Sequence, residues 1–429
     1  IPHRWHAFLS LVSPFPVPRS PSTVSLARIY QSPAAAVLED MSYAWLALCL
    51  AGGCWAAQGS TGRGAAGTEL ITEQPIIAIW AHPSNSSLPD CGGDCDFVKG
   101  AYVNWLATAG ARSLPIRYDA TPQELRPILD QVNGLLLPGG HPSLPEGVRQ
   151  VPGLSIVWAL KYAKGLNEDG DFFPVWGTCL GWEWMAETFA GDYPVITVDF
   201  DAENFTQPLG LLADAGESRM LSGVPTSLLE KAKVEPLAAN AHHKGVSPDD
   251  FVESGLDTMF RVMAINADRQ GVRTYVSVAE ALDYPMYGLQ WHPEKSQFDW
   301  GLDPDGTPHH VINHSKDAVE LSQQVLATFF ASETRRNGHS FTSISDWEPG
   351  MFHNRDVSRT PKNGQMYGFH LSESGRTKSV SAPTKDLRRQ RHSQQFGRGE
   401  SMEGGRVRKM QPPLQQSSSN RHRPLLRGT

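Results

Sequence analysis

The sequence predicts an α/β fold in which a central, mostly parallel β-sheet is covered by helices on both faces. Between residues 75 and 191, short apolar runs alternate with amphipathic helical patterns, the order found in β-α-β units. The apolar runs lack polar alternation, as expected of strands buried on both faces. Beyond about residue 340 apolar periodicity vanishes, so we expect a disordered C-terminal tail after the fold.

The elements follow one another regularly. Strands are expected at 75–81, 113–118, 134–140 and 172–177, and helices at 97–110, 121–132, 154–170 and 180–191. The first helix places its apolar side chains on one face and stops at Gly110. The second opens with Thr121 as N-cap and Glu124 completing a capping box. Strand-like runs then dominate to residue 290, at 195–200, 261–267, 274–281 and 286–291, before a closing helix at 317–334.

Composition divides the 429 residues into five segments. Residues 1–40 precede the first methionine and are interpreted as a non-native or untranslated leader. Residues 41–57 are interpreted as a signal peptide and 58–71 as a linker. Residues 72–335 are expected to form the folded body, and 336–429 a disordered basic tail.

Charge separates the body from the tail. From Arg335 onward 18 Lys and Arg stand against 7 Asp and Glu, whereas the rest of the chain carries 20 against 38. A tail rich in Arg, Ser and Gln suits salt-dependent contacts with an anionic surface, which keeps a nucleic-acid or surface binder open as a non-enzymatic alternative. A translated intron or frame error stays equally open. We do not expect the tail to contact nucleic acid.

Several features bear on the cellular compartment. The run at 41–57 is apolar and ends in small residues, although it lacks a basic n-region, and a buried helix is the alternative. Three Asn-x-Ser/Thr sequons fit secretory passage: Asn85, Asn204 and Asn313. Cys91 and Cys95 could close a small loop in an oxidising compartment; as a zinc half-site they lack a second ligand pair, so no metal is expected. No apolar run is long enough to span a bilayer. We expect a secreted or vacuolar, lysosome-like protein.

The strongest chemical signal is Gly177-Thr178-Cys179-Leu180-Gly181, between a buried strand and a helix. A nucleophile on such a turn is lifted out of the sheet, and the flanking glycines permit the tight backbone. The N-terminus of the following helix faces the sulfur, so we expect the pKa of Cys179 to be lowered. The alternative is a buried cysteine acting as a small apolar side chain.

A base and two hydrogen-bond donors complete the pattern. His292 follows the strand-like run 286–291, and Glu294 is close enough to orient its imidazole, as in hydrolytic triads. An oxyanion would need donors, for which we expect the N–H groups of Leu180 and Gly140.

These segments resemble a known family. LLLPGG, PVWGTCLGWE and YGLQWHPEKSQFDW, in this order and spacing, are similar to the γ-glutamyl hydrolases, members of the class I glutamine amidotransferase-like superfamily. The similarity spans about residues 72–335. It implies hydrolysis of folylpoly-γ-glutamates, without a cofactor, in lysosomes, vacuoles or outside the cell. A homodimer stays open.

The resemblance implies roles for individual residues. Cys179 matches the nucleophile, His292 the proton-transferring histidine and Glu294 the third triad position. His242 matches a histidine near the substrate's γ-glutamyl group, although His243 and Lys244 depart from the family pattern beside it. Glu183 lies one turn after the nucleophile, where it could meet a substrate ammonium or belong to the helix wall.

A second enzyme class stays open. A glutaminase subunit delivering ammonia to a synthetase would use the same nucleophile and base. The sequence contains no synthetase domain or ATP-binding motif, which favours a free-standing hydrolase.

Overall fold

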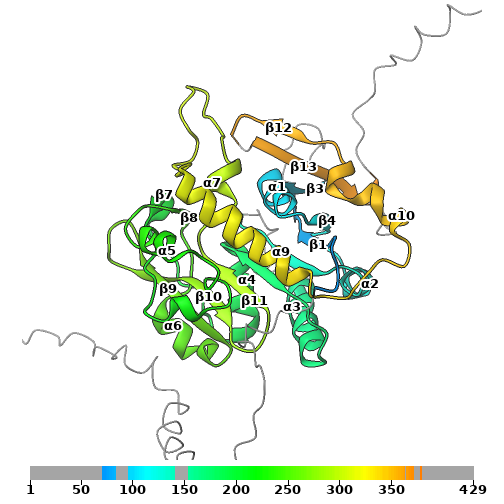
Figure 1. Cartoon of the computed structure of the whole chain (residues 1–429), viewed down its shortest axis with the longest axis horizontal. Helices are drawn as coiled ribbons and strands as arrows, with labels where there is room; N and C mark the ends of the chain where they lie inside the picture. The colour runs from blue at the N-terminus through cyan, green and yellow to red at the C-terminus, as the bar shows by residue number, and fades with distance from the viewer. Residues whose placement is uncertain (1–69, 84–94, 141–152, 363, 372–376, 379–429) are drawn as a thin grey trace, which may run out of the picture. The chain divides into compact units, whose positions relative to one another are not determined.

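The computed structural model describes residues 70–83, 95–140, 153–362, 364–371 and 377–378. Within them, seven strands form the central sheet (Figure 1). Their spatial order is β4 (Arg112–Ile116), β1 (Ile76–Trp80), β5 (Gly134–Leu137), β6 (Val175–Thr178), β11 (Met286–Leu289), β10 (Thr274–Ala281) and β9 (Phe260–Ala267). The first five are parallel to one another, and β10 runs antiparallel to both of its neighbours.

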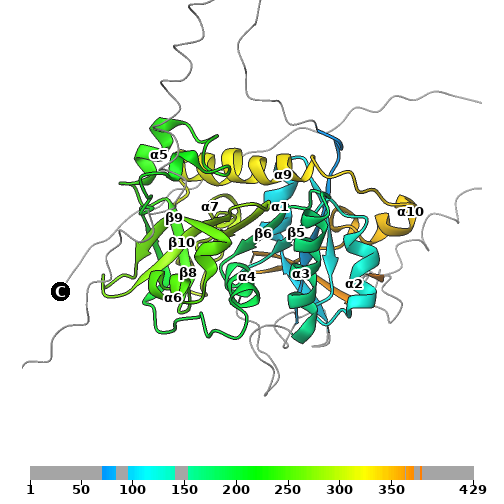
Figure 2. The same cartoon turned by 90° about the horizontal axis from the view of Figure 1, so that it is seen from below.

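Helices cover both faces of this sheet (Figure 2). One face carries α1 (Gly100–Thr108), α5 (Thr226–Ala232) and the continuous helical stretch α8 (Lys316–Val319), η5 (Glu320–Ala327) and α9 (Thr328–Thr334). The other carries α2 (Pro122–Leu129), α3 (Gly153–Glu168), α4 (Leu180–Ala190) and α6 (Pro248–Glu253). Ile77 and Ile79 of β1 join the first core, whereas Ala78 and Trp80 join the second. The two-residue period of one strand thus supplies two separate cores.

Two smaller sheets flank the central one. In the first, β7 (Ala202–Gln207) pairs with β8 (Ala238–His242). The second has the order β12 (Ser358–Thr360), β13 (Gly364–Leu371), β3 (Asp96–Lys99) and β2 (His82–Pro83), with β14 (Thr377–Lys378) also pairing with β13. The remaining elements are the short helices α7 (Lys295–Phe298) and α10 (Ile344–Trp347) and the turns η3 (Ala215–Glu217), η4 (Leu256–Thr258), η6 (Glu348–Gly350) and η7 (Phe352–Asn354).

The predicted fold class is confirmed, and most elements lie within a few residues of their expected bounds. The capping box at the start of α2 is also present, since the carboxylate of Glu124 accepts the backbone N–H of Thr121 at 2.8 Å. The expected helix at 97–110 is instead the end of β3 followed by α1. The leader, signal peptide and most of the linker lie outside the described residues, as does Cys91.

The strand expected at 195–200 is wrong. The segment pairs with the chain after β8 only through an isolated bridge, Thr197 to Gly245, and a hydrogen bond from the Phe200 N–H to His243; Val198 is 47% exposed. The strands in this region are β7 and β8, which carry mixed polar and small side chains. In this region, the availability of a partner strand determines which segments become strands, and the β propensity of the residues does not.

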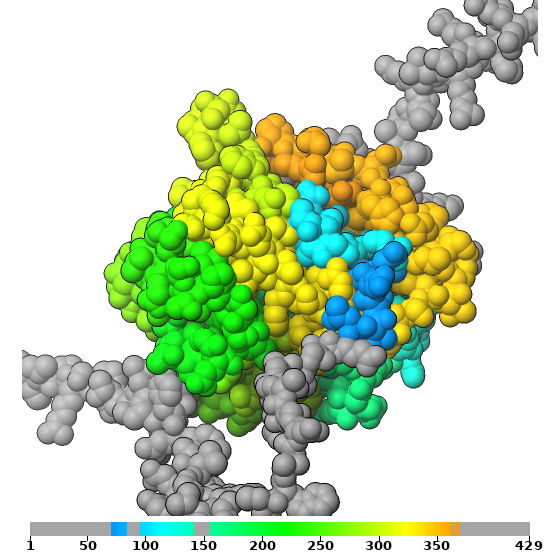
Figure 3. All heavy atoms as spheres, viewed as in Figure 1, coloured from blue at the N-terminus to red at the C-terminus, as the bar shows by residue number. Residues whose placement is uncertain are grey.

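The predicted tail begins too early. Residues 336–362 and 364–371 contain α10, η6, η7, β12 and β13, and β13 pairs with β3 of the body. Figure 3 shows this segment on the surface beside α1. Scattered apolar residues such as Met351, Phe352 and Met366 are buried, because they fill cores that the body has already built. Irregular spacing hid them from a periodicity test. Residues 379–429 lie outside the described residues.

Helix α4 starts in close contact with β5, and this contact can be tested by two glycine substitutions. A methyl group at Gly181 would lie 2.1 Å from the carbonyl oxygen of Leu137, whereas one at Gly165 in α3 would meet nothing within 4 Å. Gly181→Ala should lower the free energy of unfolding by at least about 2 kcal/mol because strand and helix must separate. Gly165→Ala, the control, should raise it by about 0.5–1 kcal/mol. Urea unfolding followed by circular dichroism measures both, and equal effects would contradict the close contact.

Candidate active site

Three neighbouring parallel strands bring the predicted site residues to one edge of the sheet. The chain leaves β5 into Gly139 and Gly140, leaves β6 into Cys179, and leaves β11 toward His292. Because β5, β6 and β11 are adjacent, their carboxyl ends meet. A methyl group added at Gly139 would lie 2.6 Å from Cε1 of His292 and 2.9 Å from Cβ of Cys179. These two side chains therefore flank the same glycine.

Cys179 occupies a strained turn between β6 and α4. Its backbone has φ 52° and ψ −111°, a region that side chains with a Cβ atom rarely adopt. The turn is tight because a methyl group at Gly177 would lie 2.7 Å from the backbone of Gly181. Cys179 is 2% exposed, and its backbone N–H donates to the carbonyl of Leu289 in β11 at 2.6 Å.

His292 is held in one orientation by Glu294. Its Nδ1 lies 2.8 Å from the Glu294 carboxylate, and the backbone N–H of His292 donates to Ala239 of β8. Since a carboxylate only accepts, Nδ1 carries the proton. Nε2 is buried and has no hydrogen-bond partner among the described residues, so it is available as a base. Burial lowers the pKa of His292, while Glu294 opposes this, so the ring is neutral near pH 7. Burial raises the pKa of Glu294, but the attraction of His292 and Lys295 outweighs it and lowers that pKa.

Tyr102 of α1 belongs to the site, although the sequence placed it only on a buried helix face. Its hydroxyl accepts the backbone N–H of Gly139 at 2.7 Å, donates toward Glu294 and lies 3.5 Å from Nδ1 of His292. Burial and the nearby carboxylate raise its pKa well above the ordinary value, so it stays protonated. Tyr102 thus ties the glycine turn to the histidine pair. Only a tyrosine among otherwise apolar face residues could have signalled this role.

The pKa of Cys179 is the opposite of what the sequence suggested. Burial raises it well above the ordinary value, and the negative charge of Glu183 raises it further. The N–H of Leu180 acts in the expected direction, lowering the pKa, but it is outweighed. The cause is desolvation of a thiolate in a site that also contains carboxylates. The resting side chain is therefore a thiol, which needs a base.

Glu183 faces the nucleophile from the first turn of α4. Its carboxylate accepts from the Gln290 side chain at 2.9 Å, and the same amide lies 3.8 Å from Sγ of Cys179. Burial raises the pKa of Glu183, while Gln290 and Lys244 act to lower it. Glu183 is buried beside Cys179, and its role as a contact for a substrate ammonium or as part of the helix wall stays a prediction.

The two histidines at the end of β8 differ in environment. His242 is fully buried, packs edge-on against Tyr275, and its Nδ1 donates to the carbonyl of Lys244 at 2.8 Å. The preceding carbonyl, of Ala241, lies 4.0 Å from Sγ of Cys179, so this strand end adjoins the nucleophile. His243 is instead exposed and lies 3.4 Å from the Glu203 carboxylate. Of the pair, only His242 is set into the protein.

The backbone N–H groups of Gly140 and Leu180, the proposed oxyanion donors, differ from that of Gly139 in whether they already donate a hydrogen bond to another residue. The N–H of Gly139 is occupied by Tyr102. That of Gly140 makes no hydrogen bond to a described residue, and that of Leu180 faces the sulfur of Cys179. Both can thus serve an oxygen that develops charge beside the sulfur.

A cavity of about 70 Å³ opens at this point, and its lining includes Tyr102, Gly140, Ala241 and His292. It gives a small acyl group room beside the base. The imidazole of His292 and the glycine turn line this space, and Cys179 lies next to two of its lining residues, Gly139 and Ala241. Such an arrangement of a thiol, a neutral oriented imidazole and N–H donors can perform acyl transfer.

Other predictions have partial outcomes. Cys95 is disulfide-bonded, and its partner lies outside the described residues. Asn204 is partly buried and its amide bonds to the 309–311 backbone, whereas Asn313 bonds to Pro236; Asn85 is outside the described residues. Within the described ranges no group of three or more His, Cys, Asp or Glu could hold a metal ion. No helix in the described part of the chain combines the length and apolar character needed to cross a bilayer.

Comparison with known proteins gives consistent relatives. Residues 93–304 match the family model for glutamine amidotransferase class-I. The chain is 35% identical over 306 residues to gamma-glutamyl hydrolase B of Dictyostelium discoideum, covering 70% of this chain and 85% of that protein. It is 33% identical to gamma-glutamyl hydrolase of Homo sapiens, with coverages of 68% and 89%. Gamma-glutamyl hydrolase 1 of Arabidopsis thaliana is 29% identical, with coverages of 62% and 74%.

The protonated thiol can be tested without a substrate. The rate of Cys179 alkylation by iodoacetamide should rise continuously with pH beyond 9, because only the thiolate reacts. Glu183→Gln removes the nearest destabilising charge and should shift this rise to lower pH. Asp192→Asn, an exposed acid beyond α4, is the control and should leave it unchanged. Mass spectrometry of the Cys179 peptide measures the rates, and a plateau below pH 7.5 would contradict the raised pKa.

Proposed function

This chain belongs to the γ-glutamyl hydrolase family, and we propose that it hydrolyses the γ-glutamyl bonds of folylpoly-γ-glutamates through a thioester on Cys179. The observation that carries the mechanism is the placement of Cys179 and His292 on either side of Gly139, with Glu294 orienting the imidazole. The family assignment makes the protein a hydrolase. The residue roles and the folate substrate are the proposed part.

The first half-reaction follows from the protonation states. Nε2 of His292 takes the proton of the Cys179 thiol as Sγ attacks the γ-carbonyl carbon. The negative charge on the carbonyl oxygen is stabilised by the N–H groups of Leu180 and Gly140. The imidazolium is stabilised by Glu294 at 2.8 Å and gives its proton to the leaving amine, so the C–N bond breaks and a thioester remains.

The second half-reaction uses the same groups. His292 removes a proton from water, which attacks the thioester carbon. The C–S bond breaks, and the sulfur regains a proton from His292. The raised pKa of Cys179 means that the site favours the thiol over the thiolate. Protonation of the sulfur by His292 at the end of the reaction is therefore favourable in free energy.

We also propose passage through the secretory pathway, with delivery outside the cell or to a vacuole. The disulfide bond of Cys95 supports this, since such bonds persist mainly in oxidising compartments. Glycosylation at Asn204 and Asn313 and a homodimer belong to the same proposal. A mass loss on enzymatic deglycosylation of protein from eukaryotic cells checks it, and no loss would remove the glycoprotein part.

Substitution of the central pair should abolish turnover of pteroylpentaglutamate. Cys179→Ala and His292→Asn should each leave less than about a hundredth of wild-type kcat/KM, because the nucleophile or its base is missing. Glu294→Gln should be milder, since the amide still holds the ring. Product masses after incubation give the rates and show whether glutamates leave singly or as a peptide. Substantial turnover by Cys179→Ala would remove it from the nucleophile role.

Linkage selectivity tests the substrate assignment. His242→Ala should lower kcat/KM for a γ-linked diglutamyl folate at least about tenfold, or 1.4 kcal/mol, because it removes a buried polar group beside the acyl site. His243→Ala, the neighbouring exposed histidine, is the matched control and should change it less than twofold. The α-linked isomer should be a poor substrate throughout. Equal cleavage of both isomers would contradict the assignment, and faster release of ammonia from glutamine would favour a glutaminase.

A further inference from the structure

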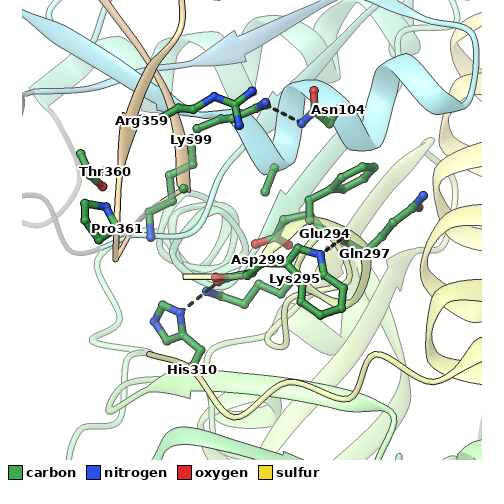
Figure 4. Close-up of a pocket in the computed structure, with 15 residues that line it drawn as sticks. Lys99, Asn104, Glu294, Lys295, Gln297, Asp299, His310, Arg359, Thr360 and Pro361 are labelled. Atoms are coloured by element: carbon green, nitrogen blue, oxygen red, sulfur yellow. Dashed lines mark hydrogen bonds and ion pairs between the residues drawn. The ribbon is translucent and has the colours of Figure 1, made fainter. Parts of the chain in front are cut away.

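A second, larger cavity adjoins the catalytic one. It measures about 470 Å³ and is lined by residues of β3, α1, α7 and the β12–β13 segment (Figure 4). Four residues line both cavities: Lys99, Glu294, Lys295 and His310. The two cavities therefore adjoin each other, separated by side chains that belong to both walls. The volume is in the range of pockets that hold small molecules.

The acids of this cavity already have polar partners. The carboxylate of Glu294 accepts a hydrogen bond from the ring of His292, and the attraction of Lys295 helps to lower its pKa. Asp299 lies 2.6 Å from Nζ of Lys295 and 3.0 Å from Nδ1 of His310. Burial raises the pKa of Asp299, but these two partners outweigh it and hold that pKa far below the ordinary value. Each carboxylate that lines the cavity therefore already has a hydrogen-bonding or charged partner.

Two cations of the cavity have no such partner. Neither Lys99 nor Arg359 forms an ion pair with a described residue, although both line the cavity. In Figure 4 the guanidinium of Arg359 lies above Lys99, on the side of Asn104, and the ammonium of Lys99 lies lower, toward Pro361. Desolvation and the nearby Lys295 lower the pKa of Lys99 to about 8. A cation whose charge the protein disfavours is one that an incoming anion would stabilise.

Both cations come from the smaller sheet, on different strands. In the pairing of β13 with β3, Met366 lies opposite Lys99, and in that of β12 with β13, Gln365 lies opposite Arg359. Because Gln365 and Met366 are consecutive, the register does not put the two side chains on one face; both belong to the lining of the same cavity. The Gln365 side chain is fixed by Asn104 of α1 at 2.9 Å. The segment after residue 340 thus contributes the guanidinium of Arg359 to the wall of the 470 Å³ cavity.

We propose that this cavity is a subsite for the α-carboxylates of glutamyl residues beyond the bond that is cut, with Lys99 and Arg359 as the binding cations. This proposal rests on the proposed function. It explains why the enzyme would prefer substrates with longer γ-linked chains. Each added glutamate brings one α-carboxylate, and guanidinium and ammonium groups are the donors that pair with carboxylates.

The test compares chain lengths in a kinetic ratio. Arg359→Gln should lower the ratio of kcat/KM for p-aminobenzoyl-pentaglutamate to that for the diglutamate by about tenfold, mainly through KM for the longer chain. Lys362→Gln is the matched control, since Lys362 lies in the same segment but pairs with Asp303 at 3.2 Å and does not line the cavity. It should leave the ratio unchanged. Lys99→Gln should act like Arg359→Gln. A ratio unchanged by Arg359→Gln would overturn the subsite, as would an equal loss for both lengths.

Binding separates this proposal from the proposed function. Calorimetry with Cys179→Ala protein and acetyl-penta-γ-glutamate should show affinity that falls about tenfold on adding Arg359→Gln. The ligand lacks an aromatic end, so binding must come from the glutamates. If wild type cut no γ-glutamyl bond while this dependence held, the hydrolase function would fail and the subsite would stand. If wild type hydrolysed the substrate but neither binding nor the ratio depended on Arg359, the subsite would fail alone.

Discussion

The site depends on one close contact, between the start of α4 and the end of β5. With hydrogen as its side chain, Gly181 lets the helix approach the Leu137 carbonyl, and a methyl group there would overlap it at 2.1 Å. This approach holds Cys179 in a backbone region that costs about 1–3 kcal/mol for a residue with a side chain. The strain turns Sγ toward the strand ends, where Gly139 separates it from His292. Packing elsewhere in the two cores must offset the cost.

The same burial that fixes this geometry sets the chemistry. Desolvation raises the pKa of the Cys179 thiol and lowers that of the His292 imidazole, so both partners rest uncharged. A resting thiolate–imidazolium pair would place two charges in a site that disfavours them. In the proposed mechanism the thiol and the imidazole stay neutral, and the proton moves from sulfur to nitrogen only as the sulfur attacks. Tyr102 couples the parts, since its hydroxyl bonds the glycine turn and approaches the Glu294–His292 pair. The N–H of Leu180 at the start of α4 lowers the pKa of Cys179, as the sequence suggested, but by less than burial raises it.

The sequence was most informative where periodicity and glycine positions carry the structure. Buried strands followed at once by Gly139, Cys179 and His292 predicted which residues meet, because parallel strands end at one edge. It was least informative where pairing across the chain decides. Strands β7 and β8 lack an apolar pattern, and the β12–β13 segment is ordered by its partner β3 rather than by its own composition. Tyr102 and Lys99 looked like ordinary residues around a helix start, since nothing local says what lies opposite.

The two cavities show how a nucleophile and a recognition surface can be built by different parts of one chain. The central sheet supplies the proposed reacting groups, Cys179 after β6 and His292 after β11, and Gly139 after β5 packs closely against both. The cations Lys99 and Arg359 come from the smaller sheet and leave the triad contacts intact. A charge added there can alter which substrates bind without moving Cys179. Such a division lets substrate preference vary while the strained turn, on which acyl transfer depends, stays fixed.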